Sequence, residues 1–528
     1  MYKLLLIPLL IVCKGYAQEP TYYGGEAGKK LDWTFFYLHN HYVDSTDIDR
    51  LAEKAILGIF KELDPYSKYQ SKEQLEEQRK RDEGIKNDGL GLQYYIIRDT
   101  ATVTYIETGS PAQYADIRRG DKILAVDGIN TISGNHKAIK SRLDAAAGIT
   151  VHFNLLRNGE EQSIDVTSTK LFATSIDATY LLDATIGYIK LNRFTSKTVG
   201  EVREALQRLE RKGAKHLVLD LRKNRGGVVK GATGLVDEFL SEDKLIMSSK
   251  GQGYAPEEYF TTADGRFKKG KLVILVDKRT ASASEIVTGA LQEWNRALII
   301  GEMTFGKGLI QQSYLLNDSA AVRLTIGRYY TPTGRTLQRP FQFDSSKDWV
   351  FKNIANAVHH GDFTAPLAAP DSVRWQTKSG RMILKGQGSI IPDIYLPQRK
   401  SQTPLLEKLN RLGLVYKFTV YHADKYRFMY LQRFKDGNAF RLDSSIDELI
   451  ITDFYDFLLK NIENQDFAQS ITNTPLPQSV LTQIKAWLGP QLWENGTYYA
   501  VFNNEDEAVL RAIRCIKDDT FDRLGVFY

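Results

Sequence analysis

The sequence is poor in cysteine and in long apolar segments, and both shortages limit what the protein is. Cys13 and Cys515 are the two cysteines among 528 residues, so a disulfide framework is excluded as the basis of the fold. Beyond the N-terminus no stretch holds 18 consecutive apolar residues, so we expect no membrane-spanning helix there. The eight histidines lack metal-ligand spacing such as His-Glu-x-x-His, and we expect neither a metal nor another cofactor.

An excess of charge of one sign is also lacking. The chain has 70 basic and 64 acidic residues, a formal net charge of +6, and no long block of lysine and arginine. This balance argues against a nucleic-acid-binding protein. With 42% hydrophobic and 25% charged residues the composition is globular, and the length predicts three or four domains.

The N-terminus predicts an export signal. Lys3 precedes the apolar stretch Leu4–Val12, and the small-residue site Gly15-Tyr16-Ala17 follows, which is the order found in signal peptides. The apolar stretch is too short to span a bilayer, although a membrane anchor or a buried strand is an alternative. We therefore expect a soluble mature chain in the periplasm or cell envelope.

The two cysteines bear on this prediction in different ways. Cys13 raises a lipoprotein alternative, which Val12 disfavours because it is larger than the residue that usually precedes a lipidated cysteine. Cleavage after Ala17 would lower the formal net charge to +4, because it removes Lys3 and Lys14 and no acid. Cys515 would then be the one cysteine left, and its helical spacing in "VLRAIRCIKDD" predicts a small core residue.

The hydrophobic periodicity changes along the chain and defines its regions. Helical spacing predominates before about residue 82, as at Leu51, Ala55 and Ile59, and we interpret these helices as packing elements. Short strands with two short helices follow, and then apolar strands alternate with helices, which predicts a largely parallel sheet. The predicted regions are a signal peptide (1–17), a helical region (18–82), a small α+β domain (83–168), an α/β core (169–400) and a helical C-terminal region (401–528) used for packing or assembly.

The small α+β domain carries a recognisable motif. In "GSPAQYADIRRGDKILAVDGINT" a helix start, Ser110-Pro111-Ala112, is followed by the turns Gly120-Asp121 and Asp127-Gly128, and this order resembles a PDZ domain. Asp116 stands where PDZ domains usually have glycine, but aspartate tolerates a left-handed backbone better than most residues.

The PDZ resemblance implies a binding loop for the C-terminus of a polypeptide. Its residues are Gly89, Leu90, Gly91 and Leu92. Glycines let backbone N–H groups converge on a carboxylate, and the strand that follows offers an edge to an extended peptide. Taken alone, this tetrapeptide is equally typical of a strand start with two permissive glycines.

Three loops of the α/β core follow strands and are expected to converge. They span 219–229, 279–285 and 301–312, at the carboxyl ends of strands, where open α/β sheets bind ligands. In the second loop, Ser282 and Glu285 have the spacing of a helix capping box. Ser282 is therefore either an N-cap, contributing about 1 kcal/mol, or a nucleophile assisted by the Ala283 N–H and the helix dipole.

A serine nucleophile needs a base, and Lys307 is the best candidate in this region. It lies between Gly306 and Gly308 in apolar surroundings, and a neutral amine produced by burial would serve as the base. In an extended segment Gln311 lies on the same face and would orient the amine. The alternatives are a solvated loop lysine and a phosphate-binding loop, but the Walker spacing fails because Gly308 follows the lysine.

Together the segments "LDLRKNRGG", "TASASEIV", "GEMTFGKGLIQ", "YYTPTGRTLQR" and "IIPDIYLP", downstream of a PDZ pattern, resemble the carboxyl-terminal processing peptidases, also called tail-specific proteases. These are serine peptidases with a Ser–Lys dyad. The resemblance implies Ser282 as nucleophile, Lys307 as general base and Gln311 as its orienting partner. It also places the oxyanion hole at the amides of Gly227 and Ala283.

The same resemblance implies a fold and a mode of action. The expected fold is a helical N-terminal arm, a PDZ domain and an α/β core related to the crotonase-like β-spiral. Two residues depart from the family pattern without touching the dyad: Thr280 replaces the usual serine, and Leu309 replaces a small hydroxyl residue. The expected activity is endoproteolysis of polypeptides captured by their accessible, apolar C-termini.

The sequence alone leaves two other functions open. One is a PDZ scaffold that binds peptides without cleaving them. Another is a hydrolase that uses a Ser-His-Asp triad elsewhere in the chain. The sequence also leaves open whether the protein associates with a membrane surface or forms a homodimer, for which the helical C-terminal region is a reasonable contact.

Overall fold

The computed structural model describes residues 25–97, 99–131, 136–316, 320–340, 374–385, 388–397 and 403–528. The predicted signal peptide, with Cys13, lies outside these residues. Within them, no helix combines the length and the apolar character needed to cross a membrane. The chain divides into two compact units between Tyr69 and Gln70.

The first unit contains two helices, α1 (Gly25–His41) and α2 (Ile48–Lys61). The side chain of Asp47 caps α2 by accepting the N–H of Arg50. The helical periodicity is confirmed, and Leu51 and Ala55 are partly buried, although no residue of either helix is fully buried. Trp33 and Ile59 are both more than half exposed.

The second unit begins with α3 (Lys72–Glu83), which leads into the predicted PDZ domain. There a sheet has the strand order β3-β4-β5-β7-β8, with β6 paired to β5, so that β3 is an edge strand. Its strands are β3 (Leu92–Ile97), β4 (Thr100–Ile106), β5 (Lys122–Val126), β6 (Ile129–Asn130), β7 (Thr150–Arg157) and β8 (Glu160–Thr167). Helices α4 (Pro111–Tyr114) and α5 (His136–Leu143) occupy the two predicted positions. Asp116 adopts a φ of 60°, the left-handed backbone expected of the residue that replaces glycine.

The α/β core is built on a sheet of six strands in the order β10-β11-β12-β15-β16-β21. All neighbouring pairs are parallel except β10 with β11. The strands are β10 (Ile176–Leu181), β11 (Ile186–Leu191), β12 (His216–Asp220), β15 (Leu272–Val276), β16 (Leu298–Gly301) and β21 (Ile394–Tyr395). Because every residue of β11, β15 and β16 is buried, this is the predicted parallel sheet with both faces covered.

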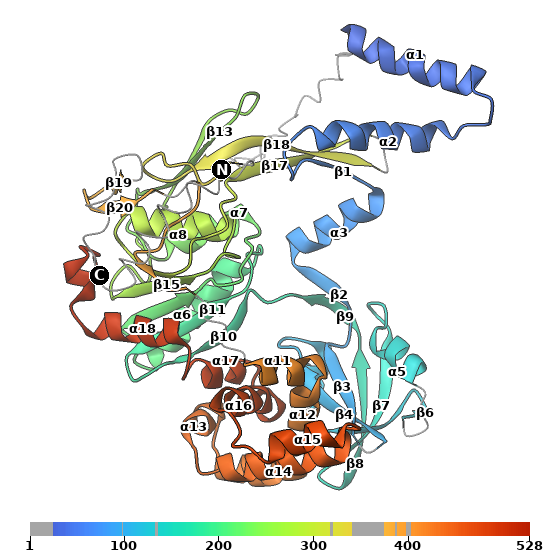
Figure 1. Ribbon diagram of the computed structural model, residues 1–528, viewed down its shortest axis with the longest axis vertical. Helices are drawn as coiled ribbons and strands as arrows, with labels where there is room; N and C mark the ends of the chain where they lie inside the picture. Colours follow the sequence, from blue (N-terminus) through green and yellow to red (C-terminus); the bar gives the residue numbers. More distant parts are fainter. Residues whose placement is uncertain are drawn as a thin grey trace, which may run out of the picture. The chain divides into compact units, whose positions relative to one another are not determined.

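Helices cover the two faces of this sheet from different parts of the chain. On one face, Ile189, Leu219 and Ile274 pack in a core with residues of α6 (Thr198–Arg211), α7 (Val229–Asp237) and α8 (Ala283–Glu293). On the other face, the neighbouring strand residues pack against α18 (Glu507–Lys517), which comes from the C-terminal region (Figure 1). Cys515 is fully buried in this second core, as its spacing predicted.

A second, antiparallel sheet lies beside the core. It includes β13 (Leu245–Lys250), β14 (Glu257–Phe260), β17 (Leu309–Leu315) and β18 (Ala321–Tyr330), of which β17 and β18 form a hairpin. The strand pairs β2 (Ile85–Gly89) with β9 (Thr169–Phe172) and β19 (Arg374–Gln376) with β20 (Met382–Leu384) are separate ribbons, and β1 spans Lys68–Gln70.

The C-terminal region is helical, as expected, and contacts both the PDZ domain and the α/β core (Figure 1). Against the PDZ domain, α12 packs at β3 and α16 at β4, and Arg119 donates a 2.7 Å hydrogen bond to Asn495. The helices are α11 (Pro404–Arg411), α12 (Leu414–Arg433), α13 (Gly437–Leu442), α14 (Asp447–Asn461), α15 (Gln465–Thr472), α16 (Gln478–Leu492), α17 (Thr497–Phe502), α18 and α19 (Thr520–Arg523).

Candidate active site

Ser282 lies between β15 and α8 in an unusual backbone conformation. Its φ and ψ are 58° and −117°, whereas an ordinary N-cap residue is extended with negative φ. The predicted capping box with Glu285 is present, so the local prediction was correct. An N-cap does not require a serine with positive φ, so this backbone strain needs another explanation. Such strain persists where the surrounding structure enforces it, often at functional sites.

Glu285 enforces the geometry of two loops at once. Its carboxylate is fully buried and accepts the Ser282 N–H at 2.8 Å, as a capping-box glutamate does. The same carboxylate accepts the N–H groups of Gly306 (2.7 Å) and Lys307 (2.8 Å) and the Thr304 hydroxyl (2.5 Å). Glu285 therefore joins the serine turn to the lysine loop, a role that the local spacing did not reveal.

Burial and hydrogen bonding act on this carboxyl group in opposite directions. Burial raises the pKa of Glu285 to about 7, although the hydrogen bonds from Thr304, Lys307, Ser282 and Gly306 all favour the charged form. All four groups donate, so the arrangement requires an acceptor on both oxygens. The ionised carboxylate is the form that fits the site.

Lys307 and Gln311 are brought together at the start of β17. The Lys307 ammonium nitrogen donates to Gln311 Oε1 at 3.3 Å. The register of β17 with β18 shifts between Ile310 and Gln311. The contact was predicted from a regular strand with alternating side chains, and β17 is not regular at this point. Leu309, where the family has a small hydroxyl residue, is buried.

A glycine-containing loop, residues 221–228, follows β12 and lies against the serine turn. A Cβ on Gly226 would come within 2.8 Å of both the Ala281 carbonyl oxygen and Ser282 Cβ, and Gly226 has a φ of 92°. A Cβ on Gly227 would approach the Phe194 carbonyl oxygen to 2.1 Å. Without a side chain, Gly226 lets the loop backbone approach the serine turn, and Gly227 lets it approach the backbone of Phe194.

Hydrogen bonds fix this loop to the serine turn, and we call it the oxyanion loop after the role predicted for Gly227. The Asn224 carbonyl oxygen accepts the N–H of Ala281 at 3.0 Å and the hydroxyl of Ser284 at 3.1 Å. The Thr280 hydroxyl donates to the Leu221 carbonyl oxygen at 3.0 Å and is fully buried. Thr280 thus provides the hydroxyl that the family's serine would supply.

A buried charge cluster lies at the start of the oxyanion loop. Arg222 donates from Nε and Nη2 to Asp220, and the Lys190 ammonium approaches the same carboxylate at 3.2 Å. Burial opposes ionisation of Asp220, yet these two cations hold its pKa well below the usual range. From the C-terminal region, Asp506 accepts Arg222 Nη1 at 3.0 and 2.9 Å. Sequence reasoning missed this cluster because its partners are far apart along the chain.

The predicted peptide-binding loop is a tight turn before the edge strand β3. Gly91 has a φ of 77°, and a Cβ there would approach Ser110 Cβ to 2.2 Å. The Leu90 and Gly91 carbonyl oxygens accept N–H groups from Ala112 and Glu107, so both carbonyls are directed into the domain. The loop and the adjoining strand edge have the features expected of a site for a polypeptide C-terminus.

No histidine that the structure describes lies in this constellation. His216 begins β12, at the opposite end of the strand from the oxyanion loop. His152 does contact Asp165 (2.6 Å) and Ser163 (3.1 Å), but this cross-strand group is exposed on β7 and β8. It lacks a helix start and a glycine loop that would stabilise an oxyanion. His359 and His360 lie outside the described residues.

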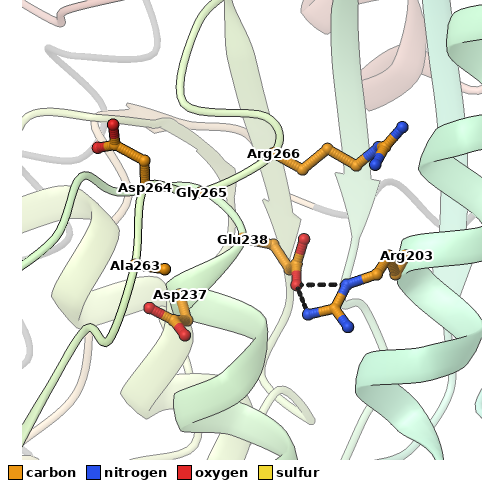
Figure 2. A pocket seen from close by; sticks show the side chains of 7 residues that line it. All are labelled: Arg203, Asp237, Glu238, Ala263, Asp264, Gly265 and Arg266. Carbon is orange, nitrogen blue, oxygen red and sulfur yellow. Dashed lines mark hydrogen bonds and ion pairs between the residues drawn. The ribbon is translucent and has the colours of Figure 1, made fainter.

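A cavity of about 290 Å³ lies apart from the predicted site, at the end of α7 (Figure 2). Its arginines have partners: Arg203 binds Glu238, and Arg266 binds Glu210. None of the predicted site residues lines it. In the described part of the chain, no cluster of three or more histidine, cysteine, aspartate or glutamate side chains is arranged to hold a metal ion.

Comparisons with known proteins identify two domains in the chain. Residues 185–344 match the model of peptidase family S41, and residues 88–167 match a PDZ domain. A probable CtpA-like serine protease of Staphylococcus aureus strain N315 is 33% identical over 320 residues. A protein of the same description from Staphylococcus haemolyticus strain JCSC1435 is 29% identical over 313 residues. In both cases the match covers 58% of this chain and 62% of the relative, less than two thirds of its length.

Among solved structures, the photosystem II D1 C-terminal processing protease is 24% identical, with a TM-score of 0.38, over 73% of this chain and 90% of that one. A putative S41 protease from Bacteroides fragilis NCTC 9343 is 18% identical, with a TM-score of 0.36, over 57% of this chain and 86% of that one. Residues 185–344 are thus similar to peptidase family S41 and residues 88–167 to a PDZ domain, and the curated relatives that match the chain are described as CtpA-like serine proteases.

Proposed function

We propose that the protein is an exported serine endopeptidase that binds polypeptide C-termini with its PDZ domain and cleaves them with a Ser282–Lys307 dyad. The single observation that carries this proposal is Glu285. One buried carboxylate accepts backbone N–H groups of both Ser282 and Lys307, so the predicted nucleophile and the predicted base belong to one hydrogen-bonded unit.

In the proposed reaction, the neutral amine of Lys307 takes the proton of the Ser282 hydroxyl as the oxygen attacks the scissile carbonyl. The resulting oxyanion accepts hydrogen bonds from the Gly227 and Ala283 amides; one such donor contributes about 3 kcal/mol. The lysinium then protonates the leaving amine, and water hydrolyses the acyl-enzyme. Gln311, which accepts from the Lys307 nitrogen, orients the base.

Substrate capture is assigned to the PDZ domain. An extended tail would add a strand to β3, whose sheet neighbour is β4 on one side, while its terminal carboxylate meets the N–H groups of the Gly89–Leu92 loop. Apolar side chains of the tail would face the apolar surface between β3 and α5, where Leu92, Tyr94 and Ile96 are partly buried. Tails that end in apolar residues are therefore the proposed substrates.

The test uses the purified chain from Gln18 and one unfolded protein prepared with two tails, one apolar and one ending in two aspartates. The variants are Ser282→Ala, Lys307→Ala and, as a matched control, His152→Ala. We expect wild type and His152→Ala to cleave the apolar-tailed protein, while either dyad change lowers kcat at least about a thousandfold. Circular dichroism verifies that the variants are folded.

Each other outcome contradicts a defined part of the proposal. If Lys307→Ala cleaves well, the dyad is wrong; if His152→Ala is inactive, a histidine triad takes its place. If wild type binds the tail without cleaving any protein, the chain is a PDZ scaffold. Equal cleavage of both tailed proteins would contradict tail capture.

The export proposal rests on residues outside the described structure and has its own test. N-terminal sequencing of the protein from the producing cells is expected to start at Gln18. Incorporation of labelled palmitate that a Cys13→Ser change abolishes would establish a lipoprotein instead. Recovery of the intact N-terminus in the cytoplasmic fraction would contradict export.

A further inference from the structure

The buried cluster at the start of the oxyanion loop contains two cations and two anions. Lys190 and Arg222 are opposed by Asp220 and Asp506. The side chains of Asp220 and Lys190 are almost completely buried, and those of Arg222 and Asp506 are 15% and 12% exposed. Removing the charge of Asp506 would leave an uncompensated positive charge in this region.

Arg222 is itself part of the oxyanion loop, and it is held from several directions. Its N–H donates to Asp220 Oδ1 at 2.9 Å, and its carbonyl oxygen accepts the Lys190 ammonium. The outer nitrogen, Nη1, is directed to both oxygens of Asp506. Each charged member of the cluster thus fixes a different part of Arg222.

Asp506 is in turn anchored at the start of α18. Its Oδ1 accepts the N–H groups of Ala508 and Val509, so Asp506 is the N-cap of that helix. The helix is packed on the sheet through Val509, Ala512 and Cys515. At its other end, Lys271, which precedes β15, donates to the carbonyl oxygens of Ile516 and Asp518. The position of the Asp506 carboxylate is therefore set by the sheet itself.

The path from Asp506 to the reacting atoms is short. Two residues beyond Arg222, Asn224 accepts the Gly226 N–H on its side chain at 2.9 Å and the Ala281 N–H on its carbonyl oxygen. A displaced Arg222 would move this segment and with it the Gly227 amide. We propose that Asp506 is a positioning residue for the oxyanion hole, supplied by the C-terminal region that neither domain match covers.

This inference rests on the proposed function, and Asp506→Asn is the variant that tests it. Asparagine caps helices about as well as aspartate and has nearly the same size, so the change removes the charge and keeps the cap. Asp506→Glu keeps the charge and serves as the conservative rescue. The control is Asp447→Asn, which breaks the 2.7 Å pair of Lys485 with Asp447 inside the C-terminal helices, away from the oxyanion loop.

The first readout is the division between kcat and KM on the apolar-tailed unfolded protein. Loss of an oxyanion donor lowers kcat about 100-fold or more, so a displaced donor is expected to lower it at least about tenfold in Asp506→Asn. KM and the affinity for the free tail peptide should stay unchanged, because the PDZ domain is untouched. Asp506→Glu should recover part of kcat, and Asp447→Asn should keep wild-type kcat. Equal losses in Asp506→Asn and Asp447→Asn would overturn the inference.

The second readout does not depend on activity. Hydrogen exchange of the amides in residues 221–228 is expected to be at least about tenfold faster in Asp506→Asn than in wild type and in Asp447→Asn. Unchanged exchange in Asp506→Asn would overturn the inference even if kcat falls. Failure of the proposed function would appear differently, as unaltered cleavage by Ser282→Ala or Lys307→Ala, and the exchange experiment would still decide the role of Asp506.

Discussion

Glu285→Gln is the change that most directly tests how the site is held together. Glu285 accepts four hydrogen bonds, two on each oxygen: Thr304 and Gly306 on Oε1, and Ser282 and Lys307 on Oε2. Glutamine has nearly the same shape but presents one oxygen and one NH₂ group. Two of the four donors would therefore lose their acceptor and face another donor.

The expected magnitude follows from that count. A buried donor left without a partner costs about 1–3 kcal/mol, so the two together cost about 2–6 kcal/mol. Each 1.36 kcal/mol that appears in the activation barrier is a tenfold loss of rate. The middle of this range is about 4 kcal/mol. If about half of it, about 2 kcal/mol, is added to the activation barrier because Ser282 and Lys307 are displaced, kcat falls about 30-fold. The remainder should appear as a lower free energy of unfolding.

The assay measures kcat and KM between pH 5.5 and 9, together with thermal unfolding. Thr288→Val is the control, since Thr288 is buried on the same helix and its hydroxyl donates to the Ser284 carbonyl oxygen of that helix. We expect Thr288→Val to keep wild-type kcat. A Glu285→Gln variant with kcat within threefold of wild type would refute the role assigned to this carboxylate.

The pH dependence of folding stability and of activity gives a second test of the role of Glu285. Because burial raises the pKa of Glu285 to about 7 from an ordinary value of 4.5, the folded protein binds the proton more tightly than the unfolded chain does. The carboxyl group therefore favours folding most below pH 4.5, and this contribution declines as the pH rises to about 7. Activity should change in the opposite sense and increase through pH 7, where the carboxylate becomes an acceptor on both oxygens. Glu285→Gln should lack that component of the profile.

Three further changes test neighbouring parts of the site. Gly226→Ala should abolish cleavage, because its Cβ would lie 2.8 Å from Ser282 Cβ, whereas Gly159→Ala, with a similar positive φ but open space, should leave kcat unchanged in the same assay. Thr280→Val removes the hydroxyl that binds the Leu221 carbonyl oxygen and should lower kcat about tenfold, while Thr280→Ser should restore kcat. Equal kcat in all three proteins would show that this hydrogen bond does not support the site. Gly91→Ala would force its Cβ to 2.2 Å from Ser110 Cβ and should weaken binding of an apolar tail peptide, measured by calorimetry, at least about tenfold; unchanged affinity would show that this turn does not shape the tail site.

The sequence was informative where the structure is local. The order of strands and helices in the PDZ domain and the parallel sheet followed from periodicity, and the capping box at Ser282 and Glu285 is present. The positive φ of Asp116 followed from its place in the PDZ motif. These features depend on residues a few positions apart, which is the range over which periodicity and capping rules apply.

What the sequence could not provide are contacts between distant segments. The sequence identifies Glu285 as a capping residue alone, because its other partners, Gly306 and Lys307, lie more than 20 residues downstream. The contact between Arg222 and Asp506 spans 284 residues, and no spacing rule reaches that far. The apolar residues of α1 and α2 were interpreted as packing, yet none of them is fully buried, because periodicity indicates which face is apolar without indicating what covers it.

The helices that cover the two faces of the central sheet lie far apart along the chain, and this has a consequence for biosynthesis. The strands of the sheet and the helices of its first face are complete well before α18 is made. At about 5–20 residues per second, the 284 residues between Arg222 and Asp506 take roughly 15 to 60 s to synthesise. Until then Val218, Val273 and Leu275 have no helix over them. The unfinished chain therefore carries an exposed apolar face, which makes it a ligand for chaperones.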